Sequence, residues 1–363
     1  MTEGAAIGSE GRKEWLIDTY QTWLEQEGLP IIQDYCIPDL MAVPLKPWKR
    51  KGGLGAFIRL VGAENADDAY LCEIPPGASL KPQKHLFDEL IYIISGKGAT
   101  TLWNEGSPKQ TFEWQEGSLF SPPLNTWHQH FNAQGDRPVR YVGVTLAPVF
   151  LNLFNDVDYI FNNNYVFKNR YNGEKDYFKK GQFLMAAVLE TNFVPNVSTL
   201  RLDDYANSQR GAGATSIEFQ MSNNIMEPHI SEFPMGTYKK AHRHSPGAHI
   251  IMLSGQGYSL MWIEDRPRIR IDWKVGSMFA PPGYWFHQHF NTGKEPARYL
   301  ALKAGEARKF RGILRHHQVS KSVKLGGDQI EYQDEAPDIR RLYKEELAKT
   351  GAQWRMSEIF PGE

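Results

Sequence analysis

The stretch that decides the fold is Trp127-His128-Gln129-His130-Phe131-Asn132, which returns 159 positions later as Phe286-His287-Gln288-His289-Phe290-Asn291. Each copy follows a Gly-x5-Pro lead-in, Gly117 to Pro123 in the first and Gly276 to Pro282 in the second. If each copy is a β-strand, its two histidines project to one face and the glutamine between them to the other. Two neighbouring imidazoles are good metal ligands and poor core residues, so the repeat predicts two metal-binding strands.

The repeat extends well beyond this stretch. At the same offset, Glu73-Ile74-Pro75-Pro76-Gly77 matches Glu232-Phe233-Pro234-Met235-Gly236, and Trp103 matches Trp262. A fixed period held over roughly 100 residues indicates a duplicated domain. The short runs of apolar and β-branched residues between Gly and Pro indicate barrels or jelly rolls. We therefore predict an all-β chain with two tandem barrels.

The parts flanking the barrels have a different composition. Apolar residues at helical spacing predict peripheral helices at 13–27 and 337–350. The segment between the repeats is too aromatic for a flexible linker, which predicts an ordered connector. We expect an N-terminal helix and lead-in at 1–42, barrel 1 at 43–150, the connector at 151–201, barrel 2 at 202–305, and a C-terminal loop and helix at 306–363.

Composition excludes several classes of protein. Lys+Arg 41 against Asp+Glu 42 gives no reason to expect nucleic acid or a membrane surface as a partner. The two cysteines, Cys36 and Cys72, form neither a metal-ligand spacing nor a disulfide framework, which fits a reducing compartment. The N-terminus lacks a signal-peptide pattern, and no apolar span reaches transmembrane length. We expect a cytoplasmic protein.

These residues resemble the bicupins, proteins with two cupin domains in one chain. The second cupin motif, Gly-x5-Pro-x-Gly-x2-His-x3-Asn, fits both repeats except that Asn125 and Tyr284 replace its inner glycine. The resemblance implies two tandem cupin barrels (jelly rolls, or double-stranded β-helices) with a few peripheral helices. It also implies a divalent metal held by three histidines and one glutamate inside a barrel.

The first cupin motif, Gly-x5-His-x-His-x(3 or 4)-Glu-x6-Gly, diverges in opposite ways. Repeat one keeps His85 and Glu89 but has Gln83 in place of the first histidine. With His128, the resemblance implies a set of two histidines and one carboxylate, like that of non-haem Fe(II) oxygenases, with Gln83 as a possible weak fourth ligand.

Repeat two keeps both histidines of the first motif and loses the acid. The resemblance implies a three-histidine set of His242, His244 and His287, with Ala248 where the glutamate should be. His249 lies one residue late and would be a ligand only if the preceding turn shifts the phase of the strand. Fe(II) is the metal we expect, with Mn, Ni or Zn as alternatives.

Further residues are candidates for roles around the metal. His130 and His289 share the strand face of His128 and His287, so we expect them to position the ligands or act as acids and bases.

Three more side chains are candidates for substrate binding. Strand alternation places Lys240 and Tyr238 on the face of His242, and it places Lys81 on the face of Gln83. These side chains could bind an anionic substrate; alternatively, the lysines leave the barrel mouth and pair with acids at its rim.

Three functions fit this sequence. The first is a non-haem iron dioxygenase that acts on a small anionic or enolic substrate, aromatic ones included. The second is a non-oxidative Mn or Zn enzyme (decarboxylase, isomerase or hydrolase), and the third is a bicupin that binds a small ligand without catalysis. Exposed barrel edges favour a homodimer or a higher homo-oligomer.

Overall fold

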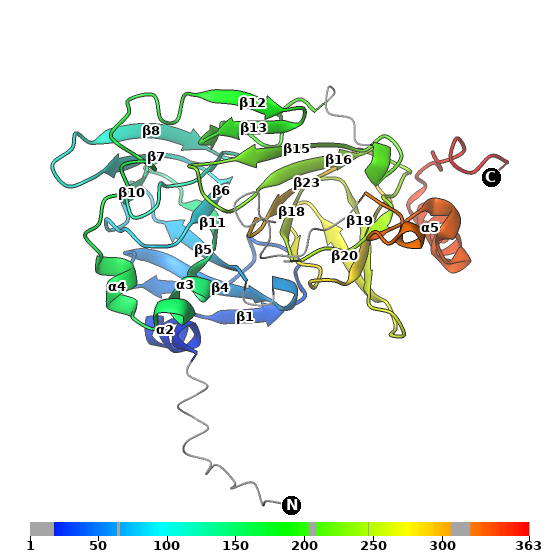
Figure 1. Cartoon of the computed structure of the whole chain (residues 1–363), viewed down its shortest axis with the longest axis horizontal. Helices are drawn as coiled ribbons and strands as arrows, with labels where there is room; N and C mark the ends of the chain where they lie inside the picture. The colour runs from blue at the N-terminus through cyan, green and yellow to red at the C-terminus, as the bar shows by residue number, and fades with distance from the viewer. Residues whose placement is uncertain (1–17, 64–65, 203–207, 246, 306–319, 363) are drawn as a thin grey trace, which may run out of the picture.

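The computed structural model describes residues 18–63, 66–202, 208–245, 247–305 and 320–362. Two β-barrels lie side by side, barrel 1 in blue and cyan and barrel 2 in green and yellow (Figure 1). The fold is thus all-β with a few peripheral helices, as predicted. No helix in the described ranges is long and apolar enough to cross a membrane.

Barrel 1 consists of two sheets that face each other. The larger sheet has the order β1-β4-β5-β11-β6-β9-β14 with β3 beside β4, and the smaller has the order β10-β7-β8. The strands are β1 (Ile31–Asp34), β3 (Lys46–Trp48), β4 (Gly53–Leu60), β5 (Asp68–Ile74), β6 (Glu89–Ser95), β7 (Lys97–Trp103), β8 (Gln110–Gln115), β9 (Leu119–Phe120), β10 (Trp127–Asn132), β11 (Val139–Thr145) and β14 (Phe193–Val194).

Barrel 2 repeats this plan. Its larger sheet has the order β12-β13-β15-β16-β23-β18-β21-β2, and its smaller sheet has the order β20-β19-β22-β17-β24. The strands are β2 (Cys36–Ile37), β12 (Gly181–Met185), β13 (Val188–Thr191), β15 (Thr215–Gln220), β16 (His229–Phe233), β17 (Ala241–His242), β18 (His249–Ser254), β19 (Gln256–Trp262), β20 (Ile269–Lys274), β21 (Met278–Phe279), β22 (Phe286–Asn291), β23 (Ala297–Leu302) and β24 (Gln329–Ile330).

The paired stretch lies on equivalent strands, β10 and β22. In β10, His128 and His130 are buried, whereas Gln129 is half-buried and donates to the Leu80 carbonyl. The alternation that placed both histidines on one face is therefore present in the structure. At the end of this strand, Asn132 Nδ2 donates to three backbone carbonyls, so the motif asparagine closes a turn and contacts no ligand.

The barrels exchange short strands through two arms. Arm 1 pairs β1 with β4 of barrel 1 and then β2 with β21 of barrel 2. Arm 2 pairs β13 with β15 of barrel 2 and then β14 with β9 of barrel 1. Each barrel is therefore completed by a strand of the arm that leads into the other barrel.

Two arginines hold the arms. Arg140 forms an ion pair with Glu73 and donates to the carbonyls of Leu40, Met41 and Val43. Arg298 forms an ion pair with Glu232 and donates to the carbonyls of Val197, Ser198 and Leu200. In each barrel, an arginine at the matching position therefore binds the backbone carbonyls of one arm.

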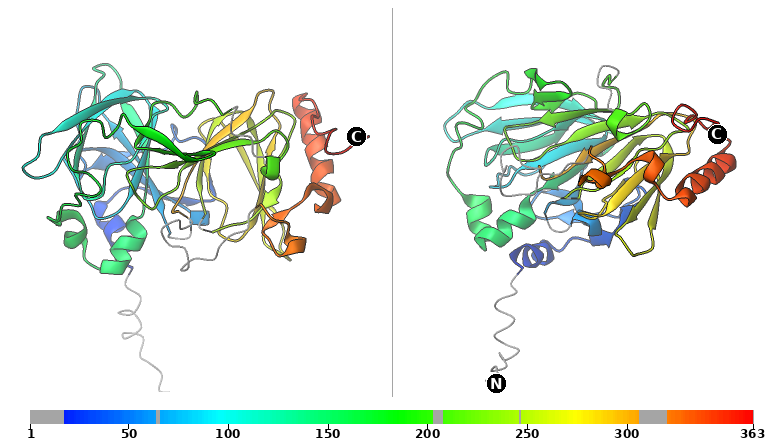
Figure 2. Two further views of the ribbon diagram at one scale, coloured as in Figure 1. Left: turned by 45° about the horizontal axis from the view of Figure 1, so that its top comes forward. Right: turned by 45° about the vertical axis from the view of Figure 1, so that its right-hand side comes forward.

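The helices lie at the outer ends of the two barrels (Figures 1 and 2). Near barrel 1 lie α2 (Thr19–Glu27), α3 (Ala147–Phe154) and α4 (Val157–Asn162), and beside barrel 2 lies α5 (Pro337–Thr350). The predicted C-terminal helix therefore has the expected bounds, while the first part of the predicted 13–27 helix falls outside the described residues.

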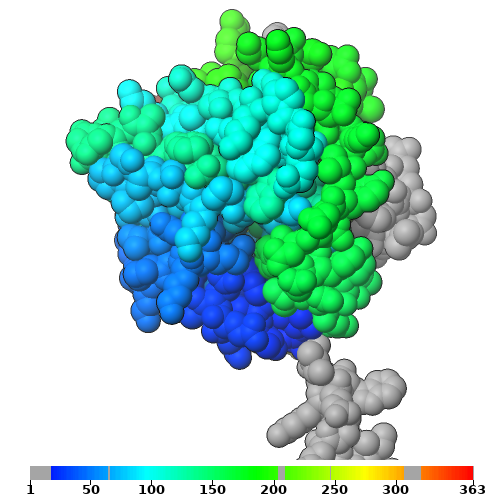
Figure 3. Space-filling model, turned by 90° about the vertical axis from the view of Figure 1, so that its left-hand side faces the viewer, coloured from blue at the N-terminus to red at the C-terminus, as the bar shows by residue number. Residues whose placement is uncertain are grey.

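The connector is ordered in its described residues and covers barrel 1. Figure 3 shows this end of the molecule, with the green connector directly beside the cyan strands. Asn125 Nδ2 donates to the carbonyls of Asn163 and Tyr165, and the rings of Phe112 and Phe178 stack with centroids 3.7 Å apart. The aromatic composition of the connector thus reflects packing against the barrel. The bounds proposed for the five parts of the chain stay a prediction.

Candidate metal centres

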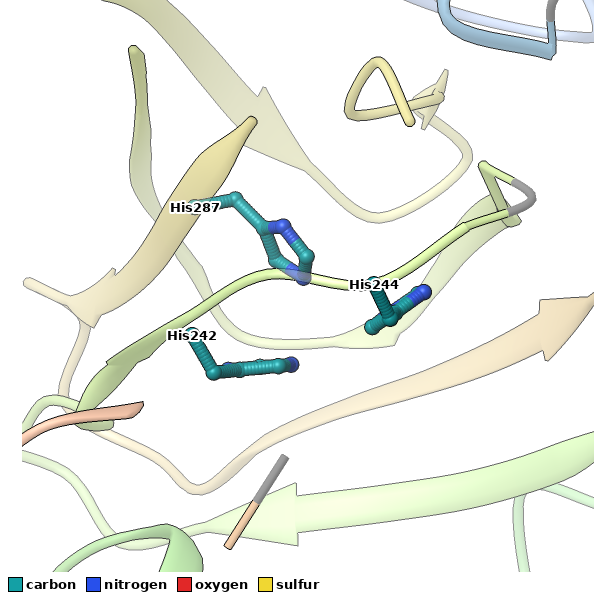
Figure 4. A group of neighbouring side chains, drawn as sticks. All are labelled: His242, His244 and His287. Carbon is teal, nitrogen blue, oxygen red and sulfur yellow. The ribbon is translucent and has the colours of Figure 1, made fainter. Parts of the chain in front are cut away.

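Three histidines meet inside barrel 2. His242 pairs in register with His287, and the turn before β22 brings in His244, whose carbonyl accepts from Tyr284 N at 2.9 Å. The three rings offer ligand nitrogens that all lie within 4.8 Å of one another (Figure 4). Such a triangle of imidazoles can bind one divalent metal.

Hydrogen bonds orient two of these rings, and burial keeps all three neutral. Nδ1 of His287 lies 3.2 Å from the Trp285 carbonyl and Nδ1 of His242 lies 3.4 Å from the Lys240 carbonyl, which leaves Nε2 of each as the ligand atom. Burial lowers the pKa of His287 to about 3. It also lowers the pKa of His242 and His244 well below the usual range, so all three rings are neutral at physiological pH.

His85, Glu89 and His128 form the second cluster, inside barrel 1. Their ligand atoms also lie within 4.8 Å of one another. His85 Nδ1 is 2.8 Å from the Phe87 carbonyl, and His128 Nδ1 is 3.0 Å from the Thr126 carbonyl. Nε2 of both histidines and Oε2 of Glu89 are buried without a hydrogen-bond partner. Three convergent unsatisfied atoms of this kind fit a bound cation.

Glu89 is held by a lysine that the sequence analysis overlooked. Lys51 is 3% exposed, and its Nζ donates to the Tyr70 hydroxyl at 2.8 Å. Tyr70 in turn donates to Glu89 Oε1. Burial alone would raise the pKa of Glu89, but Lys51 and the two histidines hold it well below its usual range. Glu89 is therefore anionic and could serve as a metal ligand.

Gln83 lies beside this cluster. Both polar atoms of its amide are buried without a partner, and its backbone pairs with His128. Together with Lys51, His85 and Glu89 it lines a cavity of about 20 Å³. This space holds about one water molecule, so only a very small ligand fits barrel 1 as it stands.

Matching hydrogen-bond networks hold His130 and His289. His289 Nδ1 lies 2.7 Å from Ser259 Oγ, which also accepts from Trp273 Nε1. Because the indole can only donate, the Ser259 proton is available to His289 Nδ1, an arrangement in which the proton of the neutral ring is on Nε2. In barrel 1, Thr100 and Trp114 hold His130 in the same way.

The structure does not bring the predicted substrate-binding side chains to the metal clusters. Lys240 Nζ pairs with Glu331 at 2.6 Å, and the Tyr238 hydroxyl donates to Glu335. Lys81 is exposed and donates to the Lys49 carbonyl.

The physical reason is a β-bulge. His242 pairs with His287 but Tyr238 pairs with Phe290, so one strand advances four residues while the other advances three. Gln83 with His128 and Ser79 with Phe131 show the same slip in barrel 1. The bulge reverses the phase that alternation predicts for the residues before the ligands.

His249 is also separate from the three histidines. Its Nδ1 lies 3.3 Å from Asp67 Oδ1 of barrel 1, and both side chains are fully buried at the contact between the barrels. The strand phase places His249 on the outer face of β18, because its neighbour Ala248 packs in the interior cluster with Phe233 and Met252.

Charged residues near the clusters were missed because they lie outside the motifs. Arg210 corresponds to Lys51 at the offset of 159. The Arg210 carbonyl accepts from the backbone N–H of Lys240, and the Lys51 carbonyl accepts from the backbone N–H of Lys81. Arg210 lowers the pKa of His242, and Lys303 lowers that of His244, after burial as the main cause. The matched basic pair was the available signal for Arg210.

Comparisons with known proteins agree on the fold. The cupin domain family model matches residues 70–145. Curated protein sequences gave no match.

Among solved structures, a deletion mutant of Bacillus subtilis oxalate decarboxylase is 13% identical, with a TM-score of 0.49 over 76% of this chain and 78% of that chain. A formate complex of Lactobacillus farciminis oxalate decarboxylase is 12% identical, with a TM-score of 0.49 over 75% and 86%. At this level of similarity, their substrate and metal do not transfer to this chain.

The matched domain lies in barrel 1, and barrel 2 has the same plan. The family model covers the strands β5 to β11 of barrel 1, which carry His85, Glu89 and His128. Barrel 2 has the same strand order and places His244 and His287 at the matching positions. Residues 70–145 of barrel 1 therefore match a cupin domain, and barrel 2 repeats the strand order of that domain.

Proposed function

We propose that the protein is a metal-dependent enzyme whose reaction takes place at His242, His244 and His287, on a small anionic substrate that binds through two oxygens. The observation that carries this proposal is the three neutral, buried imidazoles, which form a group without a carboxylate among the described residues. Three protein ligands leave open positions in a six-coordinate site for a bidentate substrate and one further molecule.

We further propose oxygen-dependent chemistry, with Fe(II) as the metal. A neutral ligand set leaves the full charge of the metal to be balanced by the substrate, which favours an anionic chelate such as an enolate or a catecholate. Bound Fe(II) would supply a Lewis acid and a redox centre for O2. This chain's own contribution would be the position of the three imidazoles and the exclusion of bulk water by the barrel.

His289 would act as a hydrogen-bond donor in this proposal. Burial holds its pKa well below the usual range, and the network from Trp273 through Ser259 leaves the proton on Nε2. A neutral imidazole of this kind donates to an oxyanion without giving up its proton.

Elemental analysis with two matched variants tests the proposal. We expect Fe in the protein as purified, loss of the barrel 2 metal in His244→Ala, and loss of any barrel 1 metal in His85→Ala. We also expect O2 consumption by the Fe(II)-loaded protein with catechol-like or enolate substrates, abolished only in His244→Ala. No O2 consumption with any such substrate, or unchanged metal content in His244→Ala, would contradict the proposal.

Non-oxidative carboxylate chemistry is the second candidate. The basic residues Arg210 and Lys303 near the three histidines suit a plain carboxylate as well as an enolate. Mn(II)-loaded protein should therefore be assayed without O2 on small carboxylates, oxalate included. Turnover under these conditions, with no O2 requirement, would replace the first reaction class by this one.

A further inference from the structure

The two barrels differ in charge at matched interior positions. Glu89 of barrel 1 corresponds to Ala248 of barrel 2 at the offset of 159. In barrel 1, Glu89 pairs in register with Thr145 of the neighbouring strand. In barrel 2, His249 pairs with Leu302, and this register continued by one residue places Ala248 beside Lys303. Barrel 2 has thus lost the acid and gained a lysine directly across from its position.

A second lysine is added in the interior of barrel 2. Lys239 corresponds to the buried Leu80 of barrel 1 and is 3% exposed. Its Nζ donates to Ser231 Oγ at 2.7 Å and to the Tyr299 hydroxyl at 2.9 Å. Both acceptors are neutral groups, and an ammonium has three N–H donors. The Tyr299 ring lies 5.5 Å from that of His289, which places this lysine on the metal side of the barrel.

Other charges are common to both barrels and do not change the difference. Arg210 corresponds to Lys51, and Glu227 corresponds to Asp68. At these matched positions, one acid lost and two lysines gained make barrel 2 more positive by three formal charges, although burial lowers the pKa of Lys239. Charges are weakly screened in such an interior, so these cations strongly favour the binding of an anion there.

We propose that a carboxylate of the substrate takes the position in barrel 2 that the Glu89 side chain fills in barrel 1, with Lys303 as its direct partner and Lys239 and Arg210 as the surrounding cations. This inference rests on the proposed function and makes it more specific. The substrate is then a small carboxylic acid with a hydroxyl or keto oxygen adjacent to the carboxylate, because the carboxylate and that oxygen together form the bidentate ligand.

A matched pair of probes tests the carboxylate. Catechol and 2-hydroxybenzoate share a ring and two oxygen donors, and only the second carries a carboxylate. We expect Zn(II)-loaded protein to bind 2-hydroxybenzoate in calorimetry, and Lys303→Thr or Lys239→Leu, each the residue of barrel 1, to weaken that binding by about tenfold or more. Catechol binding should change by less than about twofold in both variants.

Two further variants complete the test. Ala248→Glu installs the acid of barrel 1 and should abolish 2-hydroxybenzoate binding while metal content is kept. Lys240→Leu removes the lysine that pairs with Glu331 at the rim and should bind both probes as the parent does.

The outcomes separate the two proposals. Equal losses of both probes in the lysine variants, or no loss in either, with metal content unchanged, would overturn the carboxylate subsite and leave the metal site standing. Metal content that is independent of His244 would instead overturn the proposed function.

Discussion

His249 is buried against an acid of the other barrel, and its replacement distinguishes an interface residue from a metal ligand. Its Nδ1 lies 3.3 Å from Asp67 Oδ1, and neither side chain is exposed. We predict that His249→Leu leaves the metal content of barrel 2 unchanged. It should lower the free energy of unfolding by about 3 kcal/mol, because Asp67 keeps a buried charge without its partner. Elemental analysis and urea denaturation measure the two effects.

The double variant His249→Leu with Asp67→Asn is the control. It removes the stranded charge, so it should recover part of the lost stability. A fall in metal content of the single variant to the level of His244→Ala would place His249 among the ligands and contradict the prediction.

At the scale of strands, the features that could be predicted from the sequence are those that follow from period-two alternation and from the internal repeat. The strands carrying His128 and His287 were predicted because period-two alternation and the 159-residue offset persist through them. The lysines were misplaced because a one-residue bulge lies inside each first motif, just before its ligand positions. A bulge is a property of pairing between strands, and alternation within one strand carries no sign of it.

The exchange of the arms could not be predicted from sequence patterns. Strands β2 and β14 are two residues long and too short to show any period. They also match at an offset of 157, from Cys36 to Phe193, and not at 159. Which barrel an arm pairs with is decided by tertiary contacts, such as Ile37 with Met278 and Val194 with Leu119.

The arms give a reciprocal prediction. Ile37 is 5% exposed and pairs with β21 of barrel 2, whereas Val194 is 3% exposed and pairs with β9 of barrel 1. Ile37→Asp should therefore reduce hydrogen-exchange protection at Met278–Phe279 more than at Leu119–Phe120, and Val194→Asp should do the reverse. A buried carboxylate without a partner costs several kcal/mol, which is enough to open a short edge pair.

Each variant serves as the control for the other. Loss of protection confined to the barrel nearer in the sequence, barrel 1 for Ile37→Asp and barrel 2 for Val194→Asp, would show that the arms do not exchange. Mass spectrometry of exchanged peptides resolves the two sites without any assay of activity.

At the scale of the whole molecule, the two barrels are in direct contact and have different interiors. The exchanged arms, the His249–Asp67 contact and the hydrogen bonds of Ser222 and Asn224 to Ser121 join them. The two barrels approach each other closely at Gly62, where an added Cβ would lie 1.9 Å from the Ala280 carbonyl oxygen. Within this shared frame, barrel 1 places the Glu89 carboxylate beside its two histidines, whereas barrel 2 has three histidines and no matching acid at Ala248.

Among the described residues, seven histidines with lowered pKa values make the metal-free protein sensitive to acid. Burial is the main cause that lowers the pKa of each in the folded state, for two of them to about 3. They are His128, His130, His229, His242, His244, His287 and His289. In the unfolded chain each binds a proton near pH 6.5. Below that pH the unfolded state therefore binds more protons, and stability falls as the pH falls.

We predict that the free energy of unfolding of the metal-free protein decreases steadily below about pH 6.5, by roughly 1 kcal/mol per histidine for each pH unit. Asp68, whose pKa burial raises to about 7, opposes this trend as a single group. Urea denaturation between about pH 7.5 and about pH 5.5 measures the slope. His229→Tyr introduces the residue type of the matching Tyr70 of barrel 1. It should reduce the slope of the free energy of unfolding against pH by the contribution of about one proton. Equal stability at both ends of this range would mean that these histidines take up protons as readily in the folded protein as in the unfolded chain, and would contradict the lowering of their pKa by burial.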